Sequence, residues 1–137
     1  MDINSDSLVK EKLAFPVAWQ AIGWGMVCLV VYLTLTPKPP VVPGFLGWDK
    51  AQHFVAYAGL MWWYRQAFSK HLGWIVFMVV LGVGLECIQG LTDYRFFDYY
   101  DMVANTIGVA LGIILAATPL GQVLSFVDRT VDSYHHG

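Results

Sequence analysis

The stretch VAWQAIGWGMVCLVVYLTLT occupies residues 17–36 and contains no charged side chain. A helix needs about 20 predominantly apolar residues to cross the hydrocarbon core of a membrane. The stretch therefore predicts a transmembrane helix and an all-α membrane fold. It is longer than the core of a signal peptide, and it ends at Thr36-Pro37 without an Ala-x-Ala-like cleavage site. We expect it to be retained.

Three further hydrophobic runs of similar length follow, at residues 49–68, 72–91 and 101–120. The run at 72–91 contains one charged residue, Glu86, whereas the other two carry polar residues in their first turns. We predict that all four runs span the membrane. Because the connections between them are short, neighbouring helices are expected to run antiparallel in a four-helix bundle.

The composition also indicates a membrane protein. Apolar residues make up 57% of the 137 positions and charged residues 13%, which is about half of the roughly 25% usual in soluble domains. The net charge of −2 gives no indication of a nucleic-acid partner. We predict one membrane domain, residues 17–120, between an N-terminal tail at 1–16 and a C-terminal tail at 121–137.

Polar residues recur where the last three runs begin or end. Two of them, Arg95 and Asp98, lie in the connection between the third and fourth runs. If every run spans the membrane, all of these groups meet on one side of it and form a polar pocket. The candidate ligand-binding residues are Asp49, Lys50, His53, Tyr57, Glu86, Gln89, Arg95, Asp98, Asp101 and Asn105.

Helical geometry groups these residues further. At about 100° per residue, the polar residues that open the run at 49–68 share one face of their helix. In the last run, Asp101 and Asn105 are nearly in line with Gly108 and Gly112. The spacing of the two glycines allows a neighbouring helix to approach closely. We therefore expect that face to be polar at one end and tightly packed deeper in the bundle.

Basic residues near the ends of the runs indicate the orientation. More of them lie on the side of the two termini than on the side of the polar pocket, which favours cytoplasmic termini. The pocket would then face the extracytoplasmic side. The residues counted are Lys10, Lys12, Arg65, Lys70 and Arg129 against Lys38, Lys50 and Arg95.

The order and spacing of the polar residues resemble the VanZ-like family of small bacterial integral membrane proteins. The resemblance extends from about Asp49 to Gly112. It implies an integral membrane protein of the cell envelope, in the bacterial cytoplasmic membrane. The founding member of that family is linked to low-level resistance to the glycopeptide teicoplanin, but the resemblance implies no reaction. The matching pattern is Asp49-Lys50-x-x-His53-Phe54-x-x-Tyr57-x-x-Leu60, Glu86-x-x-Gln89 and Arg95-x-x-Asp98-x-x-Asp101-x-x-x-Asn105-x-x-Gly108-x-x-x-Gly112.

Three hypotheses for the polar residues remain open. In the first, basic and hydrogen-bonding side chains hold the anionic headgroup of a phospholipid or of a polyprenyl-phosphate carrier of envelope precursors. The charges are unfavourable for this, because four carboxylates accompany only two basic side chains. Some carboxylates would have to be protonated, paired or bridged by a divalent cation. The side chains assigned to the headgroup are Lys50, His53, Tyr57 and Arg95.

In the second hypothesis the chain is a membrane enzyme, in which His53 or Glu86 is the general base on a lipid-linked ester or phosphoester. No recognised catalytic or metal-binding motif supports this, and we expect neither cofactor nor metal. Cys28 and Cys87 lie inside apolar runs and have no metal-site spacing. In the third hypothesis the charges pair with one another, and residues such as Asp101 cap helix starts. The sequence does not identify a protein partner.

Overall fold

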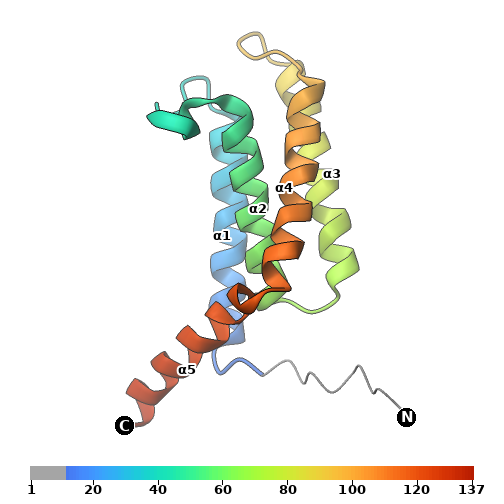
Figure 1. Ribbon diagram of the computed structural model, residues 1–137. Helices are drawn as coiled ribbons and strands as arrows, with labels where there is room; N and C mark the ends of the chain where they lie inside the picture. The colour runs from blue at the N-terminus through green and yellow to red at the C-terminus, as the bar shows by residue number, and fades with distance from the viewer. Residues whose placement is uncertain (1–11) are drawn as a thin grey trace, which may run out of the picture.

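All regular structure in the computed structural model, which describes residues 12–137, is helical. Most of the expected N-terminal tail, including Lys10, lies outside the described residues. Figure 1 shows the helices in chain order. The elements are α1 (Pro16–Leu35), the short 3-10 helix η2 (Gly44–Gly47), α2 (Asp49–Ala67), α3 (His71–Gly90), α4 (Tyr99–Ala116), the 3-10 helix η3 (Pro119–Gln122) and α5 (Val123–His136).

Helices α1 to α4 lie side by side as an upright bundle (Figure 1). The connections α1–α2 and α3–α4 lie at the upper end of this view, and the α2–α3 connection lies at the lower end together with η3 and α5. Helix α2 contacts α1, α3, α4 and α5. The upper end is therefore where the start of α2 meets the end of α3 and the start of α4.

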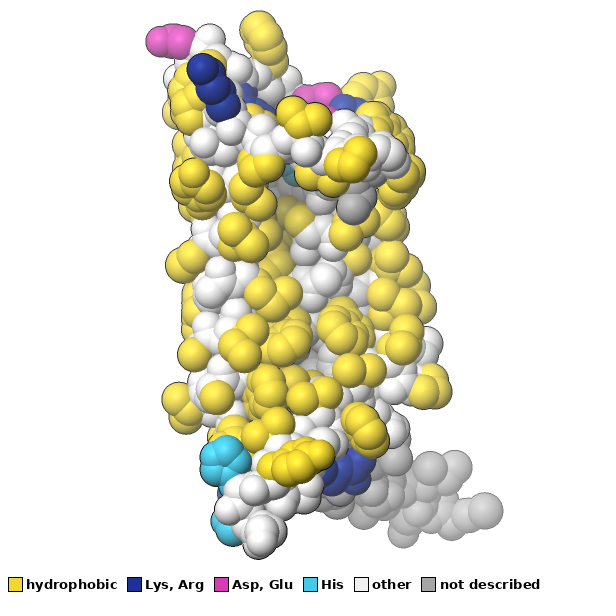
Figure 2. All heavy atoms as spheres, turned by 90° about the vertical axis from the view of Figure 1, so that its left-hand side faces the viewer, with side chains coloured by type: hydrophobic (Ala, Val, Ile, Leu, Met, Phe, Trp, Pro, Cys, Tyr) yellow, Lys and Arg dark blue, Asp and Glu magenta, His cyan; other side chains and the backbone are white. Residues whose placement is uncertain are grey.

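Among the described residues, α1, α3 and α4 are the helices whose length and hydropathy suit a membrane span. Their outer faces expose large apolar side chains, such as Leu29, Val80 and Ile114. Figure 2 shows one face of the molecule, on which hydrophobic side chains cover most of the height and charged ones gather at the two ends. Lipid is the environment that suits such a surface, because a soluble protein rarely exposes so large an apolar area.

Helix α2 differs from the other three because its polar side chains reduce its hydropathy below that of a typical span. It is also the most thoroughly buried helix, with Leu60, Met61 and Tyr64 at most 1% exposed. A central position explains both properties, since polar groups inside a bundle contact protein rather than lipid.

Two glycines bring α4 into close contact with α2. A methyl group added at Gly108 would collide with the backbone carbonyl of Phe54, and one added at Gly112 would lie 2.6 Å from the carbonyl oxygen of Ala58. Helix α4 thus packs against the backbone of α2, at the depth that the glycine spacing predicts.

Most of the residues that follow the last hydrophobic run form a helix. Helix α5 includes Asp128, which is 2% exposed and accepts hydrogen bonds from the backbone amides of Ala14 (2.6 Å) and Phe15 (3.1 Å) and from Nε1 of Trp19 (2.6 Å). Leu124 donates its amide to Oε1 of Gln66 in α2 at 2.9 Å. The carboxylate therefore satisfies amides at the start of α1, where the helix has no acceptors of its own.

Candidate functional site

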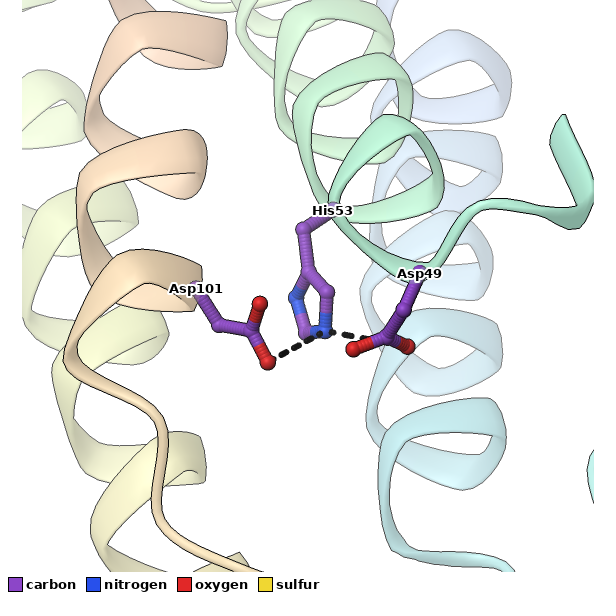
Figure 3. Close-up of side chains that lie close together, drawn as sticks. All are labelled: Asp49, His53 and Asp101. Atoms are coloured by element: carbon purple, nitrogen blue, oxygen red, sulfur yellow. Dashed lines mark ion pairs between the residues drawn. The ribbon is translucent and has the colours of Figure 1, made fainter. Parts of the chain in front are cut away.

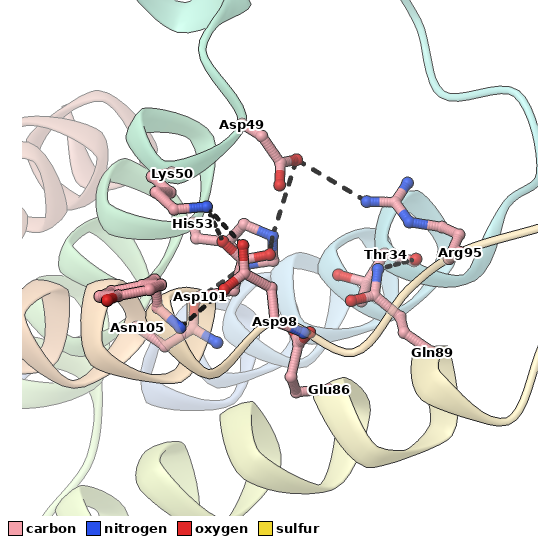
Figure 4. Close-up of polar contacts among 11 residues, drawn as sticks. Thr34, Asp49, Lys50, His53, Glu86, Gln89, Arg95, Asp98, Asp101 and Asn105 are labelled. Carbon is pink, nitrogen blue, oxygen red and sulfur yellow. Dashed lines mark hydrogen bonds and ion pairs between the residues drawn. The ribbon is translucent and has the colours of Figure 1, made fainter.

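The predicted polar residues meet at the upper end of the bundle (Figure 4). They come from the start of α2, the end of α3, the α3–α4 connection and the start of α4. Tyr57 lies one turn deeper in α2 and is 2% exposed. We call the following residues the polar cluster: Asp49, Lys50, His53, Glu86, Gln89, Arg95, Asp98, Asp101 and Asn105.

Lys50 joins α2 to the start of α4. Its Nζ donates to Oδ2 of Asp98 at 2.6 Å and to Oδ1 of Asp101 at 3.2 Å. The hydrogen bond from Lys50 lowers the pKa of the Asp98 carboxyl below its ordinary value, and the bond that this carboxyl accepts from the amide of Tyr100 lowers it further. Asp98 is thereby also the N-cap of α4, which starts two residues before the predicted run.

His53 lies between two carboxylates at the centre of the polar cluster. Its Nδ1 is 3.0 Å from Oδ1 of Asn105, while its Nε2 is 3.5 Å from Oδ2 of Asp101 and 3.9 Å from Oδ1 of Asp49 (Figure 3). The ring is 9% exposed, and the side chain of Asp101 is 5% exposed. This arrangement can hold a proton or a cation between the three groups.

Arg95 lies at the outer rim of the polar cluster. Its Nη2 is 3.7 Å from Oδ1 of Asp49, and its side chain is 20% exposed. The distance is too long for a hydrogen bond, so this is a loose ion pair. The guanidinium of Arg95 is therefore held less tightly than the ammonium group of Lys50.

Within the polar cluster, Glu86 and Gln89 connect α3 to the start of α4 and to the end of α1. Oε1 of Glu86 accepts the amide of Asp98 at 2.7 Å, whereas its buried Oε2 has no hydrogen-bond partner among the described residues. Gln89 donates Nε2 to the backbone oxygen of Thr34 at 2.7 Å. Gln89 thus satisfies a carbonyl in the last turn of α1, where helices have unpaired acceptors.

A cavity of about 280 Å³ opens beside the polar cluster, between α1, the α1–α2 connection and α2. Figure 2 shows the surface hollowed near its upper end. The wall is mainly apolar, and one end is polar. The apolar part includes Val30, Leu33, Pro39, Val42, Val55 and Ala56; the polar end comprises Asp49, Gln52, His53 and Arg95.

The cavity adds functional candidates that the sequence analysis missed. Gln52 is polar and lies at the start of α2, but it is not in line with the other polar residues of that helix. Val30 and Leu33 carry no signal beyond hydrophobicity, and Thr34 contributes a backbone oxygen rather than its side chain. Only the packing of α1 against α2 brings these groups to the site.

Comparisons with known proteins agree with this description. No solved structure matches the chain significantly. An uncharacterized protein of the fission yeast Schizosaccharomyces pombe is 30% identical over 116 residues, which cover 79% of this chain and 69% of the relative. The VanZ/LLP1 family model matches residues 15–122, which include the whole polar cluster. The resemblance noted in the sequence is confirmed: the chain belongs to the VanZ/LLP1 family.

Proposed function

We propose that α1 to α4 all cross the membrane as an antiparallel bundle, with both termini in the cytoplasm. The polar cluster would then face the extracytoplasmic side of a bacterial cytoplasmic membrane. Two observations support a span for α2: it lies beside three helices apolar enough to span, and Asp49 and Lys50 at its start have partners in the α3–α4 connection and in α4. The excess of basic residues near the termini supports the orientation.

Within this arrangement, we propose that the protein binds the headgroup of a membrane lipid or of a lipid-linked envelope precursor. The observation that carries the proposal is the cavity, which has an apolar wall and a polar end. An acyl or polyprenyl chain fits the wall formed by Val30, Leu33 and Val55, while an anionic headgroup lies at Arg95 and His53.

The contacts divide the two basic residues between different roles. Lys50 is occupied by two carboxylates at hydrogen-bond distance and holds α4. Among residues 12–137, the contact that the structure gives Arg95 is the loose ion pair with Asp49, and Arg95 lies in the cavity wall. We therefore assign headgroup binding to Arg95, whose planar guanidinium can donate two hydrogen bonds to a phosphate. We assign to Lys50 the role of positioning Asp101.

The position of His53 favours catalysis as a second candidate function. The ring is buried, lines the cavity and has a carboxylate on each side. Such a residue can act as a general base on a lipid-linked ester or phosphoester. Incubation of the purified protein with such substrates tests this, and turnover that persists in His53→Ala would exclude the role.

The binding proposal is tested by the lipids that the protein retains. The full chain, purified in mild detergent, is extracted and its lipids are identified by mass spectrometry; we expect enrichment of phosphate-bearing lipids. Arg95→Ala should retain at least about tenfold less, since bonds to charged groups contribute about 1.5 to 3 kcal/mol. Arg129→Ala, in α5 at the other end of the molecule, is the matched control. Equal retention by Arg95→Ala and wild type would disprove the assignment.

A further inference from the structure

We propose that Asp49, His53 and Asp101 form a binding site for one divalent cation of the Zn²⁺ class. Candidate ligand atoms of these three residues lie within 4.8 Å of one another (Figure 3). Imidazole nitrogen and carboxylate oxygen are both ligands of Zn²⁺. The site goes beyond the proposed lipid function and does not depend on it.

The hydrogen bond of His53 sets the direction of its free nitrogen. Oδ1 of Asn105 can only accept, so Nδ1 of His53 carries the proton that fills the 3.0 Å contact. In the neutral ring, Nε2 then has a lone pair directed at the gap between Asp49 and Asp101. Metal-binding histidines have this arrangement, in which the second ring nitrogen donates to a neighbouring oxygen.

A lone pair that faces two carboxylates is repulsive unless a positive charge lies between them. A proton on Nε2 is one solution, but a charge-assisted hydrogen bond measures about 2.7 to 2.9 Å. The observed distances are 3.5 Å to Asp101 and 3.9 Å to Asp49. A tetrahedral ion with bonds of about 2.0 to 2.2 Å separates its ligands by about 3.3 Å. The gap therefore suits an ion better than a proton.

The surroundings hold each ligand in a different way. Oδ1 of Asp101 accepts from Lys50, which leaves Oδ2 facing His53. Asp49 begins α2 and its side chain is 52% exposed, so it has room to move toward the ion. Asp101 and His53 are buried and held by hydrogen bonds. Asp49 is exposed, and it would move to become the third ligand.

The charges of the polar cluster also favour a cation. Asp49, Glu86, Asp98 and Asp101 stand against only two basic side chains, Lys50 and Arg95. A divalent ion reduces this excess of carboxylates. Because Asp49 and His53 also line the cavity, water or a phosphate oxygen could reach the ion from the cavity as a fourth ligand. Such an open fourth position is typical of catalytic rather than structural zinc sites.

The test measures Zn²⁺ binding to the full chain, purified without a histidine tag, stripped with chelator and kept in detergent free of added lipid. Isothermal titration should give one Zn²⁺ per chain. Asp49→Asn, at an exposed position that tolerates substitution, should weaken the affinity at least about tenfold. Asn105→Ala should weaken it about 10- to 100-fold, as removal of a hydrogen-bond partner of a metal-binding histidine does elsewhere.

Asp132→Asn is the matched control. Asp132 pairs with His136 on the exposed face of α5, with Oδ1 3.1 Å from Nδ1, and no third candidate ligand from the part of the chain that the structure describes joins this pair. Loss of Zn²⁺ in Asp132→Asn would place the binding on α5 and overturn the proposal. So would a wild type that binds no Zn²⁺, or an Asp49→Asn variant that binds it equally well.

A spectroscopic readout covers the case in which a variant of a buried residue fails to fold. Cu²⁺ bound to the wild type should show electron spin echo modulation from the remote nitrogen of one imidazole, and Asp132→Asn should show the same signal. Absence of imidazole modulation would overturn the site. Lipid is absent from all of these measurements, so failure of the lipid proposal would leave their outcome unchanged.

Discussion

At the scale of single residues, Lys50 connects α2 to the start of α4, which is a structural role rather than that of a ligand-binding lysine. Its two carboxylate partners lie on the connection before α4 and in the first turn of α4. A charge that already has two partners offers little to an external anion. The lysine therefore acts on the site by placing Asp101 beside His53.

Removal of Lys50 should therefore destabilise the fold. In Lys50→Met the buried carboxylate of Asp101 loses the hydrogen bond from Lys50, and we expect a loss of about 1 to 3 kcal/mol in unfolding free energy. Thermal unfolding in detergent measures this. Lys38→Met, an exposed position in the α1–α2 connection, is the control. Equal melting temperatures of the two variants would contradict the role assigned to Lys50.

Glu86 should matter as a hydrogen-bond acceptor rather than as a charge. It is 1% exposed, and its Oε1 accepts the amide of Asp98. Glu86→Leu removes this acceptor and should cost about 1 to 3 kcal/mol, whereas Glu86→Gln keeps an acceptor oxygen and should cost less. Chemical denaturation of both variants in the same detergent compares them. Equal destabilisation of the two variants would contradict the acceptor role and would show that the negative charge itself is required.

The sequence identified which residues gather at one end of the bundle but could not pair them. The spacing within α2 predicted that Lys50 and His53 share a face with Asp49. Their partners Asp98, Asp101 and Asn105 are about 50 residues away in the chain, where only the packing of α2 on α4 decides the contacts. The contacts also show that Arg95 has a loose ion pair whereas Lys50 makes two hydrogen bonds to carboxylates. Residue spacing in the sequence could not predict this difference.

At the scale of elements, the contact between α2 and α4 depends on two glycines. Gly108→Ala places a methyl group against the backbone of Phe54, which cannot move aside as a side chain can. We expect a loss of about 1 to 3 kcal/mol from overpacking. In α2, Gly59→Ala meets nothing within 4 Å and should be neutral or stabilise the helix by up to about 1 kcal/mol. Thermal unfolding of both variants checks this, and equal destabilisation would contradict the packing explanation.

Helix α5 was missed because its apolar residues are interspersed with polar ones and form no hydrophobic run, which favoured a tail. Its attachment depends on Asp128, which reaches the start of α1 more than 100 residues earlier in the chain. No local pattern predicts such a contact. By contrast, the apolar runs located α1, α3 and α4 to within a few residues, since hydropathy is a local property.

The attachment of α5 should depend on pH. Burial raises the pKa of Asp128, but the hydrogen bonds from Trp19, Ala14 and Phe15 outweigh it and lower the pKa overall. The unfolded chain, with an aspartate pKa of about 3.9, then binds the proton more readily than the folded chain. The stabilisation is therefore complete above about pH 5 and is lost as the pH falls through the folded pKa.

Asp128→Asn measures this contribution. At pH 7 the variant should melt at a lower temperature than the wild type, because an amide has only one acceptor oxygen for hydrogen bonds that use both carboxylate oxygens. Between pH 5 and pH 3 the difference between the two proteins should shrink. Asp132→Asn, on the exposed side of α5, should show no comparable pH-dependent difference from the wild type. A difference for Asp128→Asn that stays constant over this range would contradict the role of the charged form.

At the scale of the whole molecule, the hydropathy of α2 argues against a membrane span, whereas its packing among the other helices favours one. Three helices qualify as spans by composition, and the fourth is the one that they surround. A helix in that position needs little lipid-facing surface, so its hydropathy need not reach that of a span. Four spans would place the polar cluster and the α2–α3 connection on opposite sides of the membrane, and this separation can be measured.

Cysteine labelling in intact cells tests both the number of spans and their direction. The native Cys28 and Cys87 are first replaced by alanine, because both are exposed on α1 and α3 and would react with a permeant reagent. Single cysteines are then placed at Pro43, beside the polar cluster, and at Ser69, in the α2–α3 connection; both positions are exposed. We expect an impermeant thiol reagent to label Pro43→Cys from outside and Ser69→Cys only after the cells are opened.

Labelling of Ser69→Cys alone would reverse the orientation and move the polar cluster to the cytoplasmic side. Labelling of both from outside would mean that α2 does not cross the membrane and that the proposed bundle is wrong.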